Sequence, residues 1–95
     1  MDRLIFIDFD GFAAKLLNEE DRKALDGLEI ALFIDTDSYS IHRGVYLNKV
    51  VSDEKILEQE QIIRKFMELL YADVEIQSLM GKAVQKNSME SVAYA

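Results

Sequence analysis

Two short apolar stretches, each ending in Phe-Ile-Asp-x-Asp, constrain the fold of this chain more than any other feature. The first reads IFIDFDG over residues 5–11, and the second reads LFIDTDS over residues 32–38. Aliphatic and aromatic residues in runs this short predict strands. Both runs put apolar side chains on both faces of the strand, so each strand is expected to be covered on two sides.

The segment after the first run has two alternative interpretations. Asp10-Gly11 favours a tight β-hairpin, because the two central residues of a type I′ turn need positive φ. Residues 12–17 would then form the return strand. The same residues, FAAKLL, also suit a helix, since Ala, Leu and Lys are good helix formers. The sequence leaves both alternatives open and favours the hairpin slightly.

The middle of the chain predicts a short helix followed by a hairpin. Asn18 is a good N-cap, three acids follow it, and Gly27 is placed to end a helix near residues 19–26. An apolar strand over residues 28–35, the turn residues DTDS and an alternating strand over residues 38–47 then form the hairpin. One face of the later strand is half polar, so we expect it at a sheet edge.

The second half of the chain predicts amphipathic helices. Ser52 is expected to cap the longest one, whose wide apolar stripe consists of Ile56, Leu57, Ile62, Ile63, Phe66, Met67, Leu69 and Leu70. Asp73 caps a second helix, or else one bent helix continues to about residue 86. We therefore predict an α+β fold: a three- to four-stranded antiparallel sheet, made of two hairpins, covered by the C-terminal helices. Residues 1–86 would form this one compact domain, and residues 87–95 a frayed tail.

The charge and composition of the chain limit its functions. The formal net charge is −7, and the longest basic clusters are the pairs Arg22-Lys23 and Arg64-Lys65. A protein that follows nucleic-acid phosphates needs a basic patch, so we expect no direct nucleic-acid binding. The absence of cysteine excludes disulfides, thiolate zinc sites and cysteine nucleophiles. The apolar runs match neither a signal peptide nor a membrane span, so we expect a cytoplasmic protein without a membrane partner.

The paired acids also have two interpretations. In both copies a turn-forming residue, Gly11 or Ser38, follows the second Asp, and an aromatic residue comes next. Because an Asp at a turn can accept a hydrogen bond from the backbone two residues on, the favoured interpretation is structural and needs no ligand. The minor alternative is a metal site with oxygen ligands suited to magnesium or calcium, and its candidate ligands are Asp8, Asp10, Asp35 and Asp37.

The strand end FIDFDG resembles two families that use such acids to hold magnesium. It is similar to the first motif of haloacid-dehalogenase-like phosphatases and to the opening strand of Y-family DNA polymerases. The resemblance covers about eight residues. The phosphatases also need a downstream Lys on a large doubly wound fold, and the polymerases need a basic body, for which this chain has no room. Metal-dependent phosphate chemistry therefore stays a minor hypothesis.

No set of residues completes a catalytic or cofactor-binding pattern. His42 is the single histidine, and no nucleophile motif surrounds the nearby Ser38 and Ser40. The four glycines are scattered, so the sequence contains no phosphate-binding loop. We expect no enzyme activity and no cofactor. We interpret the chain as a small acidic interaction or regulatory protein that acts through protein–protein contacts.

The acidic residues suggest the nature of the partner. They gather in three groups, and the candidate partner-binding residues are Glu19, Glu20, Asp21, Asp35, Asp37, Asp53, Glu54, Glu58 and Glu60. A basic protein partner suits these groups; the alternative function is a nucleic-acid-mimicking inhibitor of a DNA- or RNA-binding protein, as in small viral anti-defence proteins. Because both apolar strands need cover on two faces and one helix layer covers one, we also expect a homodimer or higher oligomer.

Overall fold

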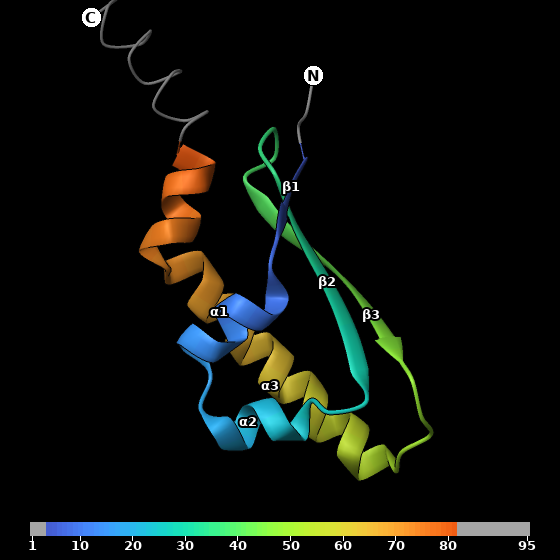
Figure 1. The fold of residues 1–95 in the computed structure, drawn as a ribbon. Helices are drawn as coiled ribbons and strands as arrows, with labels where there is room; N and C mark the ends of the chain where they lie inside the picture. The colour runs from blue at the N-terminus through green and yellow to red at the C-terminus, as the bar shows by residue number, and fades with distance from the viewer. Residues whose placement is uncertain (1–3, 82–95) are drawn as a thin grey trace, which may run out of the picture.

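The computed structural model describes residues 4–81 and has an α+β fold (Figure 1). The elements in chain order are β1 (Leu4–Ile7), α1 (Phe9–Leu16), α2 (Glu19–Ala24), β2 (Leu28–Asp35), β3 (Ser40–Leu47) and α3 (Asp53–Ala72). A further helical segment covers residues 74–81. The strands form one antiparallel sheet in the order β1-β2-β3, which confirms the predicted fold class. The predicted tail at residues 87–95 lies outside the described residues.

The favoured first hairpin is wrong, because the residues after β1 form helix α1. Asp8 is the N-cap of this helix, and its carboxylate accepts a hydrogen bond from the amide of Asp10 at 3.2 Å. Helix formers dominate the segment, and Phe12 and Ala13 are buried. Strand β1 pairs instead with β2, so the helical alternative for residues 12–17 is the correct one, and Leu17 is its C-cap.

The other elements follow the sequence closely. Asn18 caps α2 by accepting a hydrogen bond from the Asp21 amide at 2.7 Å, and Gly27 has a φ of 89°, which other residues rarely adopt. Ser52 caps α3 through the Lys55 amide at 3.2 Å. Asp73 breaks the helical run and accepts a hydrogen bond from the amide of Ile76 at 3.0 Å. Asn18, Ser52 and Asp73 confirm the predicted helix boundaries, whereas α2 ends at Ala24, two residues before the predicted end.

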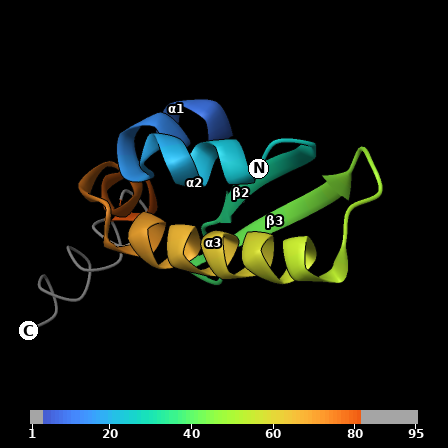
Figure 2. The ribbon, with the colours of Figure 1, turned by 90° about the horizontal axis from the view of Figure 1, so that it is seen from below.

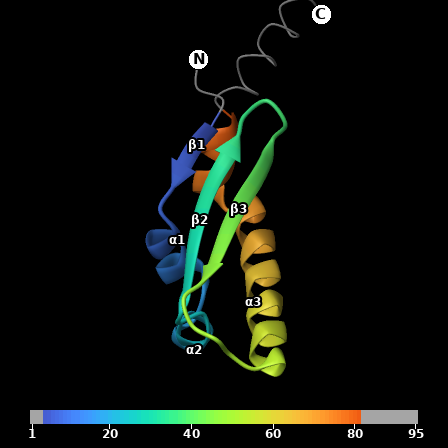
Figure 3. The same ribbon diagram turned by 90° about the vertical axis from the view of Figure 1, so that its right-hand side faces the viewer.

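The sheet and the helices form two layers. The helices all lie on one side of the sheet, as Figures 2 and 3 show. The core between the layers includes Leu32 and Ile34 of β2 and Phe66 and Leu70 of α3, each of which is almost completely buried. Gln59 of α3 is also buried, and its amide donates to the carbonyl of Ala24 at 3.0 Å, so this buried donor has a hydrogen-bond partner. No described helix is both long enough and apolar enough to span a membrane.

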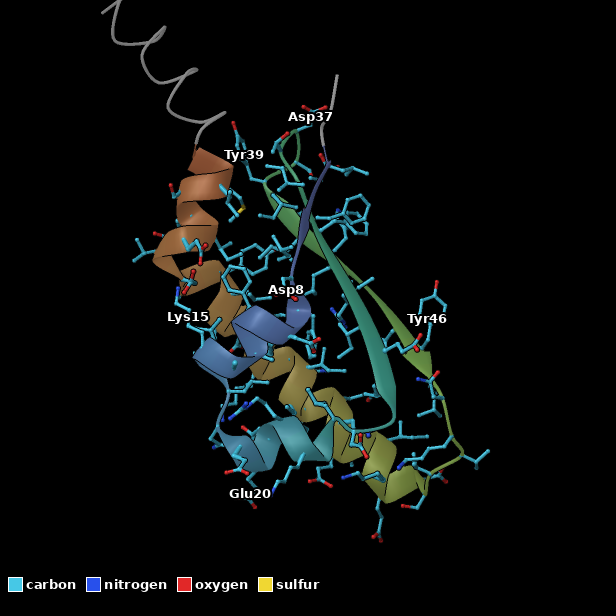
Figure 4. All side chains as sticks on the ribbon, in the orientation of Figure 1. Asp8, Lys15, Glu20, Asp37, Tyr39 and Tyr46 are labelled. Carbon is cyan, nitrogen blue, oxygen red and sulfur yellow. The ribbon has the colours of Figure 1, made fainter. Side chains whose placement is uncertain are left out.

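An ion pair connects the N-terminal half of the chain to the segment after α3. The Nζ of Lys15 on α1 lies 2.8 Å from a carboxylate oxygen of Asp73, which is buried (Figure 4). The hydrogen bond from Lys15 holds the pKa of Asp73 below its usual value of 3.8; burial opposes this shift, and the amide of Ile76 supports it. The same hydrogen bond raises the pKa of Lys15.

Removing the ring of Phe66 should destabilise the fold strongly. Phe66 is 1% exposed and contacts the ring of Phe9 edge-to-face, with 5.3 Å between centroids. We expect Phe66→Ala to lower the free energy of unfolding by about 3–5 kcal/mol, measured by urea denaturation. Leu57, which the sequence placed in the apolar stripe, is instead 56% exposed. Leu57→Ala on the same helix is therefore the control, and its loss should cost less than about 0.5 kcal/mol. Equal losses in the two variants would contradict this assignment of the core.

The charge of Asp73 should contribute fully to stability above about pH 4 and progressively less at lower pH. A carboxyl whose pKa is lower in the folded than in the unfolded chain stabilises the fold above the unfolded pKa, and this contribution disappears as the pH falls through the folded pKa. Asp73→Asn keeps the helix cap but removes the charge. The variant should therefore be less stable than the parent at pH 7, and the difference should shrink at pH 3.

The matched control is Glu68→Gln, because Glu68 is exposed on α3 and makes no ion pair among the described residues. The stability difference between this variant and the parent should be the same at both pH values. A pH-independent loss in Asp73→Asn would show that the ion pair with Lys15 contributes nothing.

Candidate functional site

The sheet face turned away from the helices, here called the outer face, carries a row of aromatic side chains. Phe6 of β1 lies opposite Phe33 of β2, which lies opposite His42 of β3. The ring centroids of the two Phe residues are 5.9 Å apart, and Phe33 stacks on His42 at 5.2 Å with an angle of 11° between the rings. Phe6 is nevertheless 75% exposed, so no described residue covers this end of the row.

The ends of the outer face are less apolar than its middle. Tyr46 lies opposite Glu29 at one end, is 65% exposed and points away from the helices (Figure 4). Leu4 lies opposite Asp35 at the other end, close to the β2–β3 turn that contains Asp37. The outer face therefore has an apolar centre with carboxylates at both ends. Monomeric proteins rarely leave such a face uncovered, and an exposed apolar patch usually marks an interaction site.

The two Asp-x-Asp pairs both serve local backbone structure. Asp8 caps α1, and Asp35 accepts a hydrogen bond from the amide of Asp37 at 3.0 Å. Leu4 pairs with Asp35 at one end of β1, whereas Asp8 follows the other end of this strand, so the pairs lie apart (Figure 4). Among residues 4–81 no three acidic or histidine side chains are grouped to hold a metal ion. Both pairs thus have the backbone role that the favoured interpretation predicts.

The candidate partner-binding acids divide between the two ends of the molecule. Those of α2 and of the first half of α3 lie at the lower end in Figure 1, and Asp35 and Asp37 lie at the upper end. Several have lysine partners: Asp21 contacts Lys65 at 2.8 Å, and Glu19 and Glu58 pair with lysines on their own helices. The structure does not gather these acids into one continuous surface.

Three side chains at the start of β3 form a hydrogen-bonded chain. The hydroxyls of Ser38 and Ser40 are bonded to each other, and the Ser40 hydroxyl lies 2.8 Å from Nε2 of His42. All three groups are on the surface, and no carboxylate contacts the His42 ring among the described residues. A nucleophile–base pair needs a group that orients the base, and none is present in the described part of the chain.

A second surface feature, which we call the β3–α3 groove, was not predicted from the sequence. It encloses about 580 Å³ and is lined by Leu28, Arg43, Val45, Leu47, Ile56, Gln59, Glu60, Ile63, Arg64 and Met67. Val45 and Leu47 lie on the sheet face that packs on the helices, yet they are 41% and 47% exposed. Because the two residues are two positions apart on β3, they share one face of the sheet, but only the position of α3 leaves them uncovered.

Comparisons with protein-family models, with curated proteins and with solved structures give no match for this chain. The described residues thus offer two surfaces for function: the outer face with its acidic ends, and the β3–α3 groove with the adjoining edge of the sheet.

Divalent cations should not stabilise the protein. Asp8 and Asp35 each accept a backbone hydrogen bond, and the two acid pairs do not converge. We expect millimolar magnesium or calcium to leave the melting temperature unchanged, both in the parent and in an Asp8→Asn, Asp35→Asn double variant. A rise of several degrees in the parent alone would establish metal binding at these pairs.

Proposed function

We propose that this chain is a non-enzymatic interaction protein whose outer face binds a protein partner. The observation that carries the proposal is the exposed aromatic row, Phe6–Phe33–His42, on a sheet whose helices all lie on the other side. Large rings that are already held in place by their neighbours lose little conformational entropy on binding, which makes them effective anchors of an interface.

The charges around the row suggest the chemistry of the partner. Glu29 lies on the outer face at one end, Asp35 and Asp37 lie at the other, and the described part of this face carries no Lys or Arg. A partner with an apolar patch flanked by basic residues would bury the rings and face these acids. Such charge complementarity mainly sets the rate and specificity of association. A cytoplasmic location and a regulatory role fit this proposal.

The alternative, a mimic of nucleic acid, stays a prediction and has weaker support. A mimic needs carboxylates spaced along one continuous surface, and here they divide between two ends and are partly neutralised by Lys23, Lys55 and Lys65. The exposed rings of the aromatic row, by contrast, are best buried against an apolar patch on a protein partner. We therefore favour the protein partner with an apolar patch.

A random peptide library displayed on phage provides a test. Peptides selected on the parent should combine apolar residues with Lys or Arg. Their affinity should fall about tenfold or more in Phe6→Ala and Tyr46→Ala, as for other interface anchors. It should also fall in Glu29→Lys and at raised salt.

Leu57→Ala is the matched control, because Leu57 is an exposed apolar residue of α3 on the helical side of the molecule. Selected peptides should bind this variant as they bind the parent. Binding that is insensitive to Phe6 and Tyr46 but sensitive to residues of the helices would overturn the proposal.

A further inference from the structure

Strand β3 presents an open backbone edge to solvent. The amide of Asn48 donates to Gly27 on the β2 side at 2.8 Å, and the amide of Ile41 donates outward to the hydroxyl of Tyr71 at 2.7 Å. Because backbone groups alternate in direction along a strand, those of Arg43, Val45 and Leu47 also point outward. Within residues 4–81 they have no hydrogen-bond partner, and β3 pairs only with β2.

The helix layer extends beyond this edge. In Figure 3 helix α3 runs alongside β3 on the side away from β2, and the β3–α3 groove lies between them. A strand added next to β3 would therefore lie over α3 and cover the exposed side chains of Val45, Leu47 and Ile56. An open edge strand above an uncovered apolar groove provides both requirements for strand addition: backbone partners and an apolar surface to bury.

We propose that the added strand is β3 of a second copy of this chain, paired antiparallel about a two-fold axis at Gly44. In this register Arg43 lies opposite Val45 of the other copy, and Ile41 lies opposite its Leu47. The outward backbone N–H and C=O groups of Arg43 in one copy then bond to those of Val45 in the other copy. A register centred one residue earlier would set Arg43 against its own copy, which like-charge repulsion disfavours.

The distribution of charge favours a second copy at this edge. The chain carries −7, so two copies repel each other wherever acidic surfaces meet. From Ser38 to Ser52 the sequence contains no acidic residue, and β3 lies within this stretch. The groove beneath the added strand contains Glu60, but Arg43 and Arg64 line it as well. The β3 edge is therefore a surface on which two acidic copies can approach with little electrostatic cost.

The aromatic row gives an independent reason. It crosses the sheet from Phe6 through Phe33 to His42 and ends at the open edge. Pairing about Gly44 places Tyr46 of the second copy opposite His42 on the outer face. The row would then continue into the neighbouring sheet, and the exposed ring of Tyr46 would gain a cross-strand aromatic neighbour. The inference does not depend on the proposed partner of the outer face.

Cysteine cross-linking tests the register directly, because the chain has no cysteine of its own. Opposed residues of a non-hydrogen-bonded antiparallel pair have Cα atoms about 4.5 Å apart, within the range that a disulfide spans. A Cβ at Gly44 meets only Tyr46, at 3.8 Å, so Gly44→Cys should fold. Under mild oxidation it should form a disulfide-linked dimer about tenfold or more faster than Ser40→Cys, which lies on the same face but far from the axis.

The oligomeric state provides a second measurement. Light scattering at micromolar concentration should give about twice the 10.9 kDa chain mass for the parent. Val45→Lys places a positive charge opposite Arg43 of the other copy and should give the monomer mass. Val74→Lys, the same exchange at a residue that is 78% exposed on the helical segment 74–81, should remain dimeric.

Three outcomes would overturn the inference. The first is a monomeric parent across the micromolar range. The second is a dimer that survives Val45→Lys but is lost in Phe6→Ala, since the second copy would then occupy the outer face. The third is equal cross-linking of Gly44→Cys and Ser40→Cys, which would indicate random collision.

Discussion

The packing of α3 against a single face of a three-stranded sheet is the contact on which the rest of this structure depends. Phe66 and Leu70 of α3 lie with Leu32 and Ile34 of β2 at the centre of the core. The same contact leaves the outer face of the sheet without cover, although β1 and β2 carry apolar side chains on that face as well. It also leaves a groove at the edge of β3, because the helix runs past the sheet edge and does not close over it. Both candidate surfaces thus arise from one asymmetric helix layer.

The two copies of Phe-Ile-Asp-x-Asp show how one local motif leads to different structures. In each copy the first Asp accepts a hydrogen bond from the amide two residues on. After Asp8 the helix formers of residues 12–17 extend this turn into α1, whereas after Asp35 the sequence TDSYSI continues as a turn and a strand. The carboxylate therefore ends the strand by holding the backbone of the next two residues, and the residues that follow select a helix or a turn.

Much of the fold could be predicted from the sequence because its signals are local. The caps Asn18 and Ser52, the apolar run of β2, the alternation of β3 and the helical spacing of apolar residues in α3 act within a few residues of the chain. The predicted hairpin at Asp10-Gly11 was wrong because the turn signal there competes with the helix propensity of the residues that follow. The pairing of β1 with β2, which is distant in the sequence, decides between the two. That pairing is a tertiary contact, which local patterns do not encode.

The sequence by itself determined which residues are apolar, which are acidic and where α2 and α3 begin, because these properties depend on side-chain chemistry and near neighbours. It also indicated that β1 and β2 carry apolar side chains on both faces. Only the tertiary structure decided that Phe6 and Tyr46 stay exposed, that the acids divide between two ends and that Val45 and Leu47 border a groove. The physical reason is that burial depends on where α3 crosses the sheet, and the long-range packing of the whole core sets that position.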